Sequence, residues 1–391
     1  MKLDVYYLDY TGYEFGVEPI PTRATLYSAV SVSTTEFYNG VGKMTLVAIG
    51  SERNRAALKL DSIVYEINSK MTYIIVNVRY DAAADRITAN GYSANWLLAR
   101  RAVAQFVRIP PGYKVGPVVD EVETDVYALV SENVCTDHFV QTWDNSDEQE
   151  LQNRRDPRIS VAASKNLGIH LNDPKRFSYL SADEFPTVLD ASVECLEAAG
   201  IGHRMNFDPD KKTWEFEIYQ GQDKTSTVAF VEEHGTLGGI SFEFDSTTFR
   251  NVAAVPLFYE GHTNDAGNKI ATMLFFGAGE GAERYETILP MQTERSDEGG
   301  LFEERVKNLA FKELSKCLSR QTFTVSGIDT ADLGKKFNLG DLVKCVSNRL
   351  GIEFDARITC IRRTFDSRRE TVELVLGDPV LTVLSAQTFP V

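Results

Sequence analysis

The feature that most constrains this chain is the recurrence of short alternating apolar and polar stretches near both of its ends. Residues 23–32 and 71–80 alternate in the first part, and residues 240–244 and 355–365 alternate in the last part. Alternation with a period of two residues is typical of strands that bury one face. The sequence therefore predicts a β-rich multidomain protein of the α+β class.

Helical spacing of apolar residues interrupts the strands at four places. The expected helices span residues 94–104, 117–130, 187–199 and 301–318. Ser93 is the expected N-cap of the first helix, and Pro117 suits the first turn of the second. Gly200 is the expected stop of the third helix. The fourth is the clearest, because Phe302, Val306 and Leu314 recur on one face.

The order of these elements indicates three domains. Residues 1–105 are expected to form a β domain with one helix and to end in a hairpin of residues 71–80 and 86–91. Residues 106–235 alternate helix and strand, which favours an α/β insert, with an exposed acidic loop at residues 141–155. Residues 236–391 return to strands around the helix at 301–318.

Composition excludes several classes of function. The formal net charge is -15, with 56 acidic and 41 basic residues, which is the wrong sign for a tight, sequence-independent grip on DNA. No apolar run approaches the length of a membrane span, and the N-terminus starting Met1-Lys2-Leu3 lacks the apolar core of a signal peptide.

Cysteine and histidine give no sign of a metal or redox site. The chain contains Cys135, Cys195, Cys317, Cys345 and Cys360, and His138, His170, His203, His234 and His262. No two cysteines lie within ten residues of each other, and no histidine belongs to an HExxH pair. We expect the cysteines to be reduced, buried hydrophobes, and we expect no metal and no cofactor.

Two patterns could suggest chemistry or binding, and each has a simpler explanation. Gly277–Gly281 lacks the Lys-Ser/Thr of a phosphate loop, which favours a turn. No G-x-S-x-G nucleophile elbow occurs. Acidic pairs such as Glu232–Glu233, Glu303–Glu304, and Glu52 with Asp61 are expected by chance among 56 acids. We therefore expect no catalytic residues and no enzyme.

The N-terminal aromatic residues leave a binding alternative open. They are Tyr6, Tyr7, Tyr10, Tyr13 and Phe15. They could stack on a carbohydrate or a peptide, but packing at a subunit interface explains them better, because tyrosine is favoured there. A receptor-binding or carbohydrate-binding tip protein thus stays an alternative, as does a cell-wall hydrolase that uses paired carboxylates.

Two stretches resemble the tail-associated hub proteins of siphophages. The first runs from Ile87 to Val103 and contains Leu97-Leu98-Ala99-Arg100-Arg101; the second contains Leu339-Gly340-Asp341-Leu342-Val343 and Ile358-Thr359-Cys360-Ile361. Between them, Arg154–Arg158 is similar to a basic segment that precedes a strand in that family. The motifs occur in the family's order and span most of the chain.

The resemblance implies a fold and a function. A baseplate-hub-like fold would have two tail-tube-like β-barrels and a small α/β insert. Three chains would form a ring that joins the tail tube to the distal tip and lines the channel for DNA ejection. An acidic wall would let DNA pass without specific binding. The implied partners are tail tube, distal tail, tape measure, and tip or fibre proteins.

The same resemblance implies a location and leaves some points open. The protein would assemble in the host cytoplasm and belong to the virion, at the tail tip. Longer relatives continue into a cell-wall-degrading extension, whereas this chain stops at Val391, so we expect another protein to do that work. A contractile injection machine hub fits as well as a siphophage hub, and the sequence names neither host nor receptor.

Overall fold

The computed structural model describes most of the chain, which divides into two compact units. The described residues are 3–8, 21–26, 29–67, 70–103, 118–136, 138–141, 149–152, 155–176, 186–231, 239–264, 267, 269–294, 301–317, 320–326, 332–349, 351–366 and 369–377. Unit 1 combines Met1–Ser241 with Phe323–Gly377, and unit 2 contains Phe242–Thr322. No helix of the described residues is long and apolar enough to cross a membrane.

The N-terminal part of unit 1 consists of strands and two short helices. They are β1 (Leu3–Leu8), β2 (Pro21–Leu26), β3 (Ala29–Phe37), β4 (Lys43–Ile49), α1 (Glu52–Ala57), β5 (Ile63–Glu66), β6 (Met71–Asp81), β7 (Arg86–Ser93) and α2 (Trp96–Ala99). The expected β6–β7 hairpin is present, with Asp81 opposite Arg86.

The rest of unit 1 adds a middle segment and a C-terminal group of strands. The middle segment contains β8 (Val118–Glu121), α3 (Val122–Val134), β9 (His138–Gln141), β10 (Gln149–Gln152), β11 (Ile159–Val161), β12 (His170–Arg176), α4 (Val188–Ala199), β13 (Gly202–Asp208), β14 (Thr213–Tyr219) and β15 (Ala229–Val231). The C-terminal strands are β21 (Arg320–Ser326), β22 (Leu342–Ser347), β23 (Ile352–Asp366) and β24 (Glu370–Gly377).

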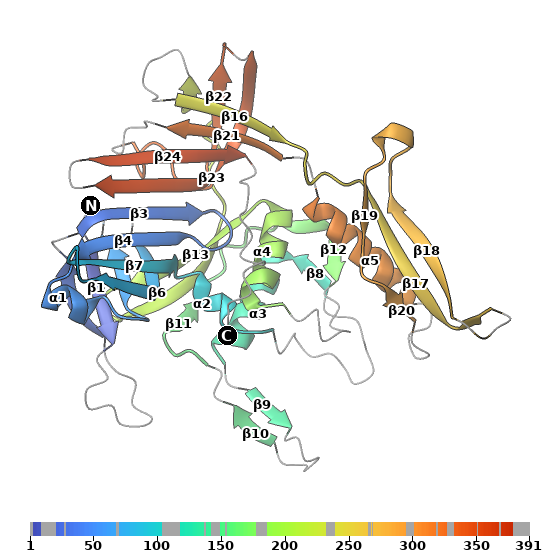
Figure 1. The fold of residues 1–391 in the computed structure, drawn as a ribbon, viewed down its shortest axis with the longest axis horizontal. Helices are drawn as coiled ribbons and strands as arrows, with labels where there is room; N and C mark the ends of the chain where they lie inside the picture. The colour runs from blue at the N-terminus through green and yellow to red at the C-terminus, as the bar shows by residue number, and fades with distance from the viewer. Residues whose placement is uncertain are drawn as a thin grey trace. The chain divides into compact units, whose positions relative to one another are not determined.

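One sheet joins the two ends of the chain. Its main path runs β16-β21-β24-β23-β3-β4-β7-β6-β5-β1-β2, with β16 (Gly239–Asp245) at one end. Figure 1 shows the red C-terminal strands β24 and β23 beside the blue N-terminal strands β3 and β4. The two ends of this path, β16 and β2, do not pair with each other, so the described pairings close no barrel. The expected pair of closed barrels is replaced by a single sheet that continues through both strand groups.

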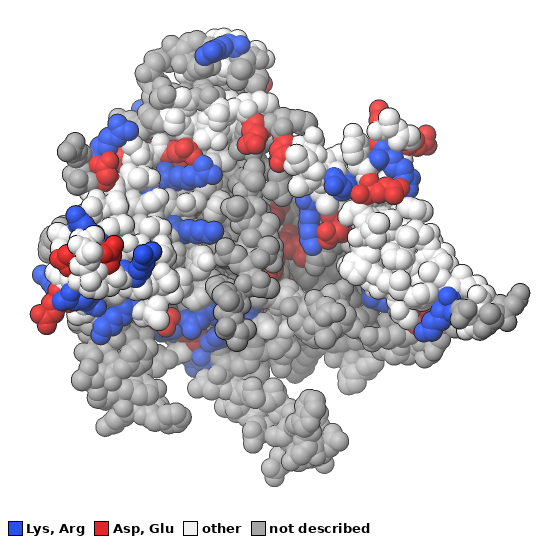
Figure 2. All heavy atoms as spheres, in the orientation of Figure 1, with Lys and Arg blue, Asp and Glu red and all other residues white. Residues whose placement is uncertain are grey.

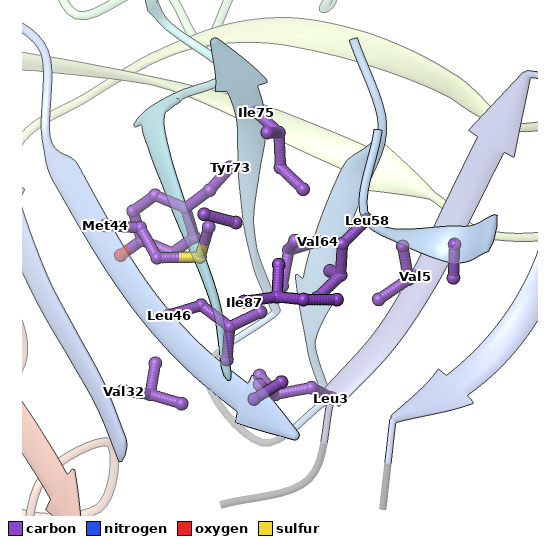
Figure 3. Close-up of a cluster of buried hydrophobic side chains, with 13 residues drawn as sticks. Leu3, Val5, Val32, Met44, Leu46, Leu58, Val64, Tyr73, Ile75 and Ile87 are labelled. Carbon is purple, nitrogen blue, oxygen red and sulfur yellow. The ribbon is translucent and has the colours of Figure 1, made fainter. Parts of the chain in front are cut away.

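Two apolar cores lie under this sheet. The N-terminal core gathers side chains from β1, β3, β4, β5, β6 and β7, and Figure 3 shows Leu46, Val64 and Ile87 pointing toward one another. Leu58, next to α1, contributes to it from outside the sheet. The C-terminal core contains Phe323 and other side chains from β21 to β24. Each strand group thus buries its own apolar face, as the alternation predicts.

Unit 2 is a four-stranded sheet with a helix on one face. Its elements are β17 (Val252–Thr263), β18 (Lys269–Gly277), the 3-10 turn η3 (Gly281–Glu283), β19 (Glu286–Ile288), β20 (Gln292–Thr293) and α5 (Leu301–Lys316). Phe302, Val306 and Leu314 of α5 are buried against Val255 and Leu257 of β17. The helix expected at 301–318 is therefore present, with its C-terminal end at Lys316.

The structure corrects the other helix predictions at their ends. The first helix is only Trp96–Ala99, because the backbone carbonyl of Arg101 accepts the N–H of Val188 and the carbonyl of Pro186 accepts the N–H of Val103. Ser93 does not cap it, since its hydroxyl accepts the N–H of Gly42.

The middle segment differs from expectation in two further places. The second helix begins at Val122 instead of Pro117, with Glu121 as the N-cap and strand β8 before it. Part of the expected loop at 141–155 forms the hairpin of β9 and β10. Helix α4 follows its prediction closely, with Thr187 as its N-cap and Gly200 in the left-handed conformation at its end.

Candidate functional site: the exposed face of the shared sheet

The junction of β3 and β23 presents an outer face rich in hydroxyl and amide groups. Burial alternates along β3, β4 and β7, so every second side chain points away from the core. Register places Thr35 opposite Arg362 and Ser33 opposite Thr364, on the outer side of both strands. We call this surface the polar face. Its hydroxyl and amide members are Ser31, Ser33, Thr35, Thr45, Asn77, Thr88, Asn90, Thr364 and Thr371.

Hydrogen bonds between neighbouring strands satisfy part of this face. The hydroxyl of Thr45 donates to Oδ1 of Asn90 at 3.0 Å, and Nδ2 of Asn90 donates to Oδ1 of Asn77 at 3.2 Å. On the other side of the β3–β23 junction, the guanidinium of Arg362 donates to the carboxylate of Glu373. Because these groups pair within the sheet, the face offers few strong, unpaired binding groups.

The charges of the polar face are sparse and mixed. Its cations are Lys43, Arg79, Arg86 and Arg362, and its anions are Asp81, Asp366 and Glu373. Figure 2 shows blue and red side chains scattered over a largely white surface in the region of β23, β3 and β4. The acidic residues that give the chain its charge of -15 are not concentrated here.

The buried side of the same junction holds a cluster of ionisable groups. Arg363 of β23 contacts Glu66 of β5 at 2.9 Å and Glu370 of β24 at 2.8 Å, and the Arg363 and Glu66 side chains are only 9% and 2% exposed. The carboxylate of Glu36 on β3 accepts from the Tyr73 hydroxyl at 3.4 Å. Burial raises the pKa of Glu36 to about 7, while the charge of Arg363 opposes that rise.

Tyr38, directly after β3, connects three segments of unit 1. Its hydroxyl accepts the N–H of Gly221 at 3.3 Å and donates to the carbonyl of Tyr219 at 3.2 Å. Its ring packs under the guanidinium of Arg357, at 5.3 Å. A Cβ on Gly340 would lie 2.3 Å from that ring, so glycine is required at this close approach.

The Leu-Gly-Asp-Leu-Val motif has a structural role at the same place. The buried carboxylate of Asp341 accepts the N–H of Gln222 at 2.8 Å and the N–H of Asn338 at 2.9 Å. Gly340 has a φ of +92°, which favours glycine. The motif therefore fixes the approach of the middle segment to β22 and β23.

The aromatic residues at the N-terminus do not form a described binding surface. Tyr6 is 3% exposed, and its ring packs edge-on against Phe207 at 5.3 Å. It is a core residue that joins β1 to the middle segment. The side chain of Tyr7, and Tyr10, Tyr13 and Phe15, lie outside the described residues.

The other candidate patterns resolve into local structure. The Gly277–Gly281 loop closes on Asn251, whose carbonyl accepts the N–H of Ala278 at 3.1 Å and whose Nδ2 donates to the carbonyl of Glu283 at 2.7 Å. The segment is a loop that leads from β18 into the 3-10 turn Gly281–Glu283. Arg158 pairs with Asp156 at 2.8 Å and lies over the Trp214 ring.

The acidic pairs form no described carboxylate site. Glu303 and Glu304 occupy the first turn of α5, and Asp61 pairs with Arg100 at 3.6 Å. Glu232 and Glu233 lie outside the described residues, as does Arg154 of the basic segment. Within the described part of the chain, no group of His, Cys, Asp and Glu side chains could hold a metal ion.

Three of the five cysteines, and His203, are buried side chains. Cys195, Cys345 and Cys360 are buried, and burial raises the thiol pKa of Cys345 and of Cys360 to about 12. A thiol with a raised pKa is a poor nucleophile at neutral pH. His203 is buried, with Nδ1 3.3 Å from Oδ1 of Asn39. The side chains of His138, His234 and His262 are not among those described.

Comparison with known proteins gives a siphovirus family for the chain and a fold similar to that of phage tail proteins. A family model for Siphovirus ReqiPepy6 Gp37-like proteins matches residues 22–378. The 43 kDa tail protein of prophage MuSo2 from Shewanella oneidensis has a similar fold, with a TM-score of 0.51, 10% identity, and coverage of 97% of this chain and 100% of that one. The tail protein from Neisseria meningitidis MC58 gives a TM-score of 0.50 at 13% identity, with coverage of 97% and 96%.

No curated protein matches the sequence. The family match covers well over half of the chain and includes both stretches that resemble hub proteins. The two structural similarities, at low identity, concern the fold alone. The chain belongs to the Siphovirus ReqiPepy6 Gp37-like family, and the family match and the tail-protein folds support the resemblance to siphophage hub proteins.

Proposed function

We propose that three copies of this protein form the hub ring of a phage tail tip. This ring would join the tail tube to the distal tip and surround the DNA channel. The β3–β23 pairing carries the proposal, because it joins strands from both ends of the chain into one sheet with a broad polar face. In the virion, the partners would be tail tube, distal tail, tape measure, and tip or fibre proteins. The division at residues 105 and 235 would separate two wall-forming segments from an insert.

The polar face is the surface we assign to the channel wall. A wall for passing DNA should neither bind phosphate tightly nor present apolar area to it. Hydroxyl and amide groups that pair with one another favour both conditions, with exposed Ile49 at the end of β4 as an apolar exception on this face. The mixed charges of Lys43, Arg79, Asp81 and Glu373 leave little net attraction. This replaces the expected acidic wall by a weakly charged one, with the same consequence of passage without specific binding.

A ring also requires two edges that can meet between copies. β5 pairs with β6 only from Met71 to Ile74, so among the described strands the stretch Asn77–Asp81 has β7 on one side alone. The sheet path itself ends at β2 and at β16, and β16 offers the second edge. Exposed Arg79 on β6 and exposed Glu243 on β16 have opposite charges. We propose that these two edges meet in the ring, as a head-to-tail contact that closes by rotation.

A charge swap tests this contact. Arg79→Glu and Glu243→Lys, each alone, should reduce incorporation of the protein into tail particles, because each places like charges together. The double variant should restore incorporation. Lys212→Glu is the matched control, because Lys212 is a partly exposed cation on the turn between β13 and β14, away from both edges and from the polar face. Equal defects in the single and double variants would contradict the edge contact, and a protein that never joins tail particles would contradict the hub itself.

A second experiment tests the assignment of the polar face. Thr45→Lys with Asn90→Lys adds two cations to this face without touching the core. In assembled particles, genome release should slow, and added salt should relieve the slowing because it screens phosphate contacts. Changing exposed Lys211 and Lys212, on the turn between β13 and β14, to Gln should leave release unchanged. Unaltered release by the Thr45 and Asn90 variant would remove this face from the channel.

A further inference from the structure

The β3–β23 junction has unequal numbers of buried opposite charges. Arg363 provides the guanidinium, and Glu66, Glu370 and Glu36 provide carboxyl groups around it. The hydrogen bonds of Arg363 go to Glu66 at 2.9 Å and to Glu370 at 2.8 Å and 3.2 Å. These two carboxylates together carry more negative charge than one guanidinium can neutralise. The positive charge of Arg363 therefore stabilises an ionised Glu36 only in part.

Glu36 is the carboxyl group in this cluster without a cation in hydrogen-bond contact. Its one described side-chain partner is the Tyr73 hydroxyl, at 3.4 Å, which is a long bond. Tyr73 is itself 1% exposed and lies among the core side chains of Figure 3. A buried carboxylate with a single long neutral hydrogen bond is unfavourable, whereas a protonated carboxyl group at the same place is tolerated.

The remaining titratable groups near Glu36 do not supply a compensating charge. Cys360 of β23 and Tyr219 of β14 lie within its electrostatic reach. Burial raises the pKa of both, so each stays neutral where Glu36 would ionise. Glu66 acts in the direction that opposes ionisation of Glu36, and Arg363 acts in favour of it.

We propose that a proton on Glu36 locks β3 to β23, so that this junction loosens when the proton is lost. Loss of the proton would place a third negative charge beside one guanidinium in a largely buried site. The junction can relieve that repulsion by separating β3 from β23, which would admit water to the cluster. The device thus couples pH to the contact between the N-terminal and C-terminal strand groups, whatever the assembly to which the chain belongs.

The direction of the pH dependence follows from the raised pKa. An unfolded Glu36 has a pKa near 4.5, and the folded one has a pKa of about 7. The lock is therefore complete below the unfolded value, weakens as pH rises between the two values, and stays weak above the folded value. The opening equilibrium of the junction should grow by up to about tenfold for each pH unit in that window.

Hydrogen exchange of the full chain tests the lock where it acts. Protection of the β3 and β23 amides, corrected for the intrinsic exchange rate, should fall from about pH 5 to about pH 8 in the wild-type protein. Glu36→Gln imitates the protonated group, so it should keep these amides protected across the range. Glu373→Gln, on the outer face of β24, should retain the wild-type dependence. A wild-type junction with no pH dependence, or a Glu36→Gln junction that keeps it, would overturn the proposal.

A titration of the wild-type protein avoids any question about the variant's folding. The side-chain carboxyl carbon of Glu36, followed by NMR, should titrate near neutrality, well above exposed glutamates such as Glu52. Titration in the ordinary range of an exposed glutamate would also overturn the proposal. Neither measurement depends on a hub function, so failure here and failure of the tail-particle experiments are distinguishable.

Discussion

At the residue scale, the structure gives structural roles to positions that the sequence identifies only by their resemblance to hub proteins. The Leu339–Val343 motif resembles that of hub proteins, but the residues that its side chains and backbone contact lie far away along the chain. Asp341 accepts from Gln222, and Gly340 packs on Tyr38. Contacts between residues separated by more than a hundred positions have no local pattern. The resemblance could therefore point to the motif without explaining it.

Gly221 offers a sharp test of this packing. A Cβ there would lie 1.8 Å from the carbonyl oxygen of Gly340, so backbone would have to move. We expect Gly221→Ala to destabilise unit 1 by about 2–4 kcal/mol, as overpacking against rigid neighbours does. Gly239→Ala is the control, because its Cβ would meet only the Ser326 hydroxyl oxygen, at 3.3 Å. Chemical unfolding measures both, and equal small losses would contradict the packing argument.

His203 predicts a pH dependence opposite in sign to that of Glu36. Burial lowers the pKa of His203 from 6.5 to about 4, because the charged ring is desolvated. Its contribution to stability is complete above pH 6.5 and is lost as pH falls toward 4. We expect amides of β13 to lose protection in acid, where those of β3 and β23 gain it. His203→Gln should remove the β13 trend alone, and hydrogen exchange resolves the two regions.

At the element scale, the sequence predicts the ends of a helix well where capping residues lie at those ends. It does not predict the end of a helix that is set by hydrogen bonds to a distant part of the backbone. Thr187 and Gly200 bracket α4 in the sequence and in the structure. The first helix ends early because residues 101–103 hydrogen-bond to residues 186–188. The helix α1 was missed, although Ser51 caps it by accepting the N–H of Asn54. A six-residue helix carries too little periodicity to be distinguished from a loop.

Helix α5 allows buried and exposed phenylalanines to be compared on one element. Phe302 is 1% exposed and packs edge-on against Tyr259, whereas Phe311 is 47% exposed. We expect Phe302→Ala to destabilise unit 2 by about 3–5 kcal/mol and Phe311→Ala by less than about 1 kcal/mol. Circular dichroism during urea unfolding measures both. A comparable loss in the two variants would contradict the burial of α5 on β17.

At the scale of the whole molecule, the sequence predicted β-rich ends but not their union. Alternation specifies which face of each strand is buried, and it does so equally for two closed barrels and for one continuous sheet. The pairing of Thr34 with Arg363 joins positions more than 300 residues apart, and only the tertiary structure reveals it. The polar face was missed for the same reason, since its threonines and asparagines come from strands that meet only in the fold.

Arg362 and Arg363, neighbours on β23, allow a test of how far the stability of the whole sheet depends on the β3–β23 junction. Arg363 is buried between Glu66 and Glu370, whereas Arg362 projects from the polar face. Arg363→Met leaves buried carboxylates without their cation, so we expect a loss of about 3–5 kcal/mol. Arg362→Met removes an exposed pair and should cost less than about 1 kcal/mol.

Because the chain divides into two compact units, the loss of stability in Arg363→Met should be confined to unit 1. Arg363→Met should lower the unfolding transition of unit 1 and leave the protection of the α5 amides in unit 2 unchanged, whereas Phe302→Ala should do the reverse. Hydrogen exchange at increasing urea separates these responses. If Arg363→Met lowered protection equally in α5 and in β3, the units would unfold together, and the junction would stabilise the entire chain instead of the sheet alone.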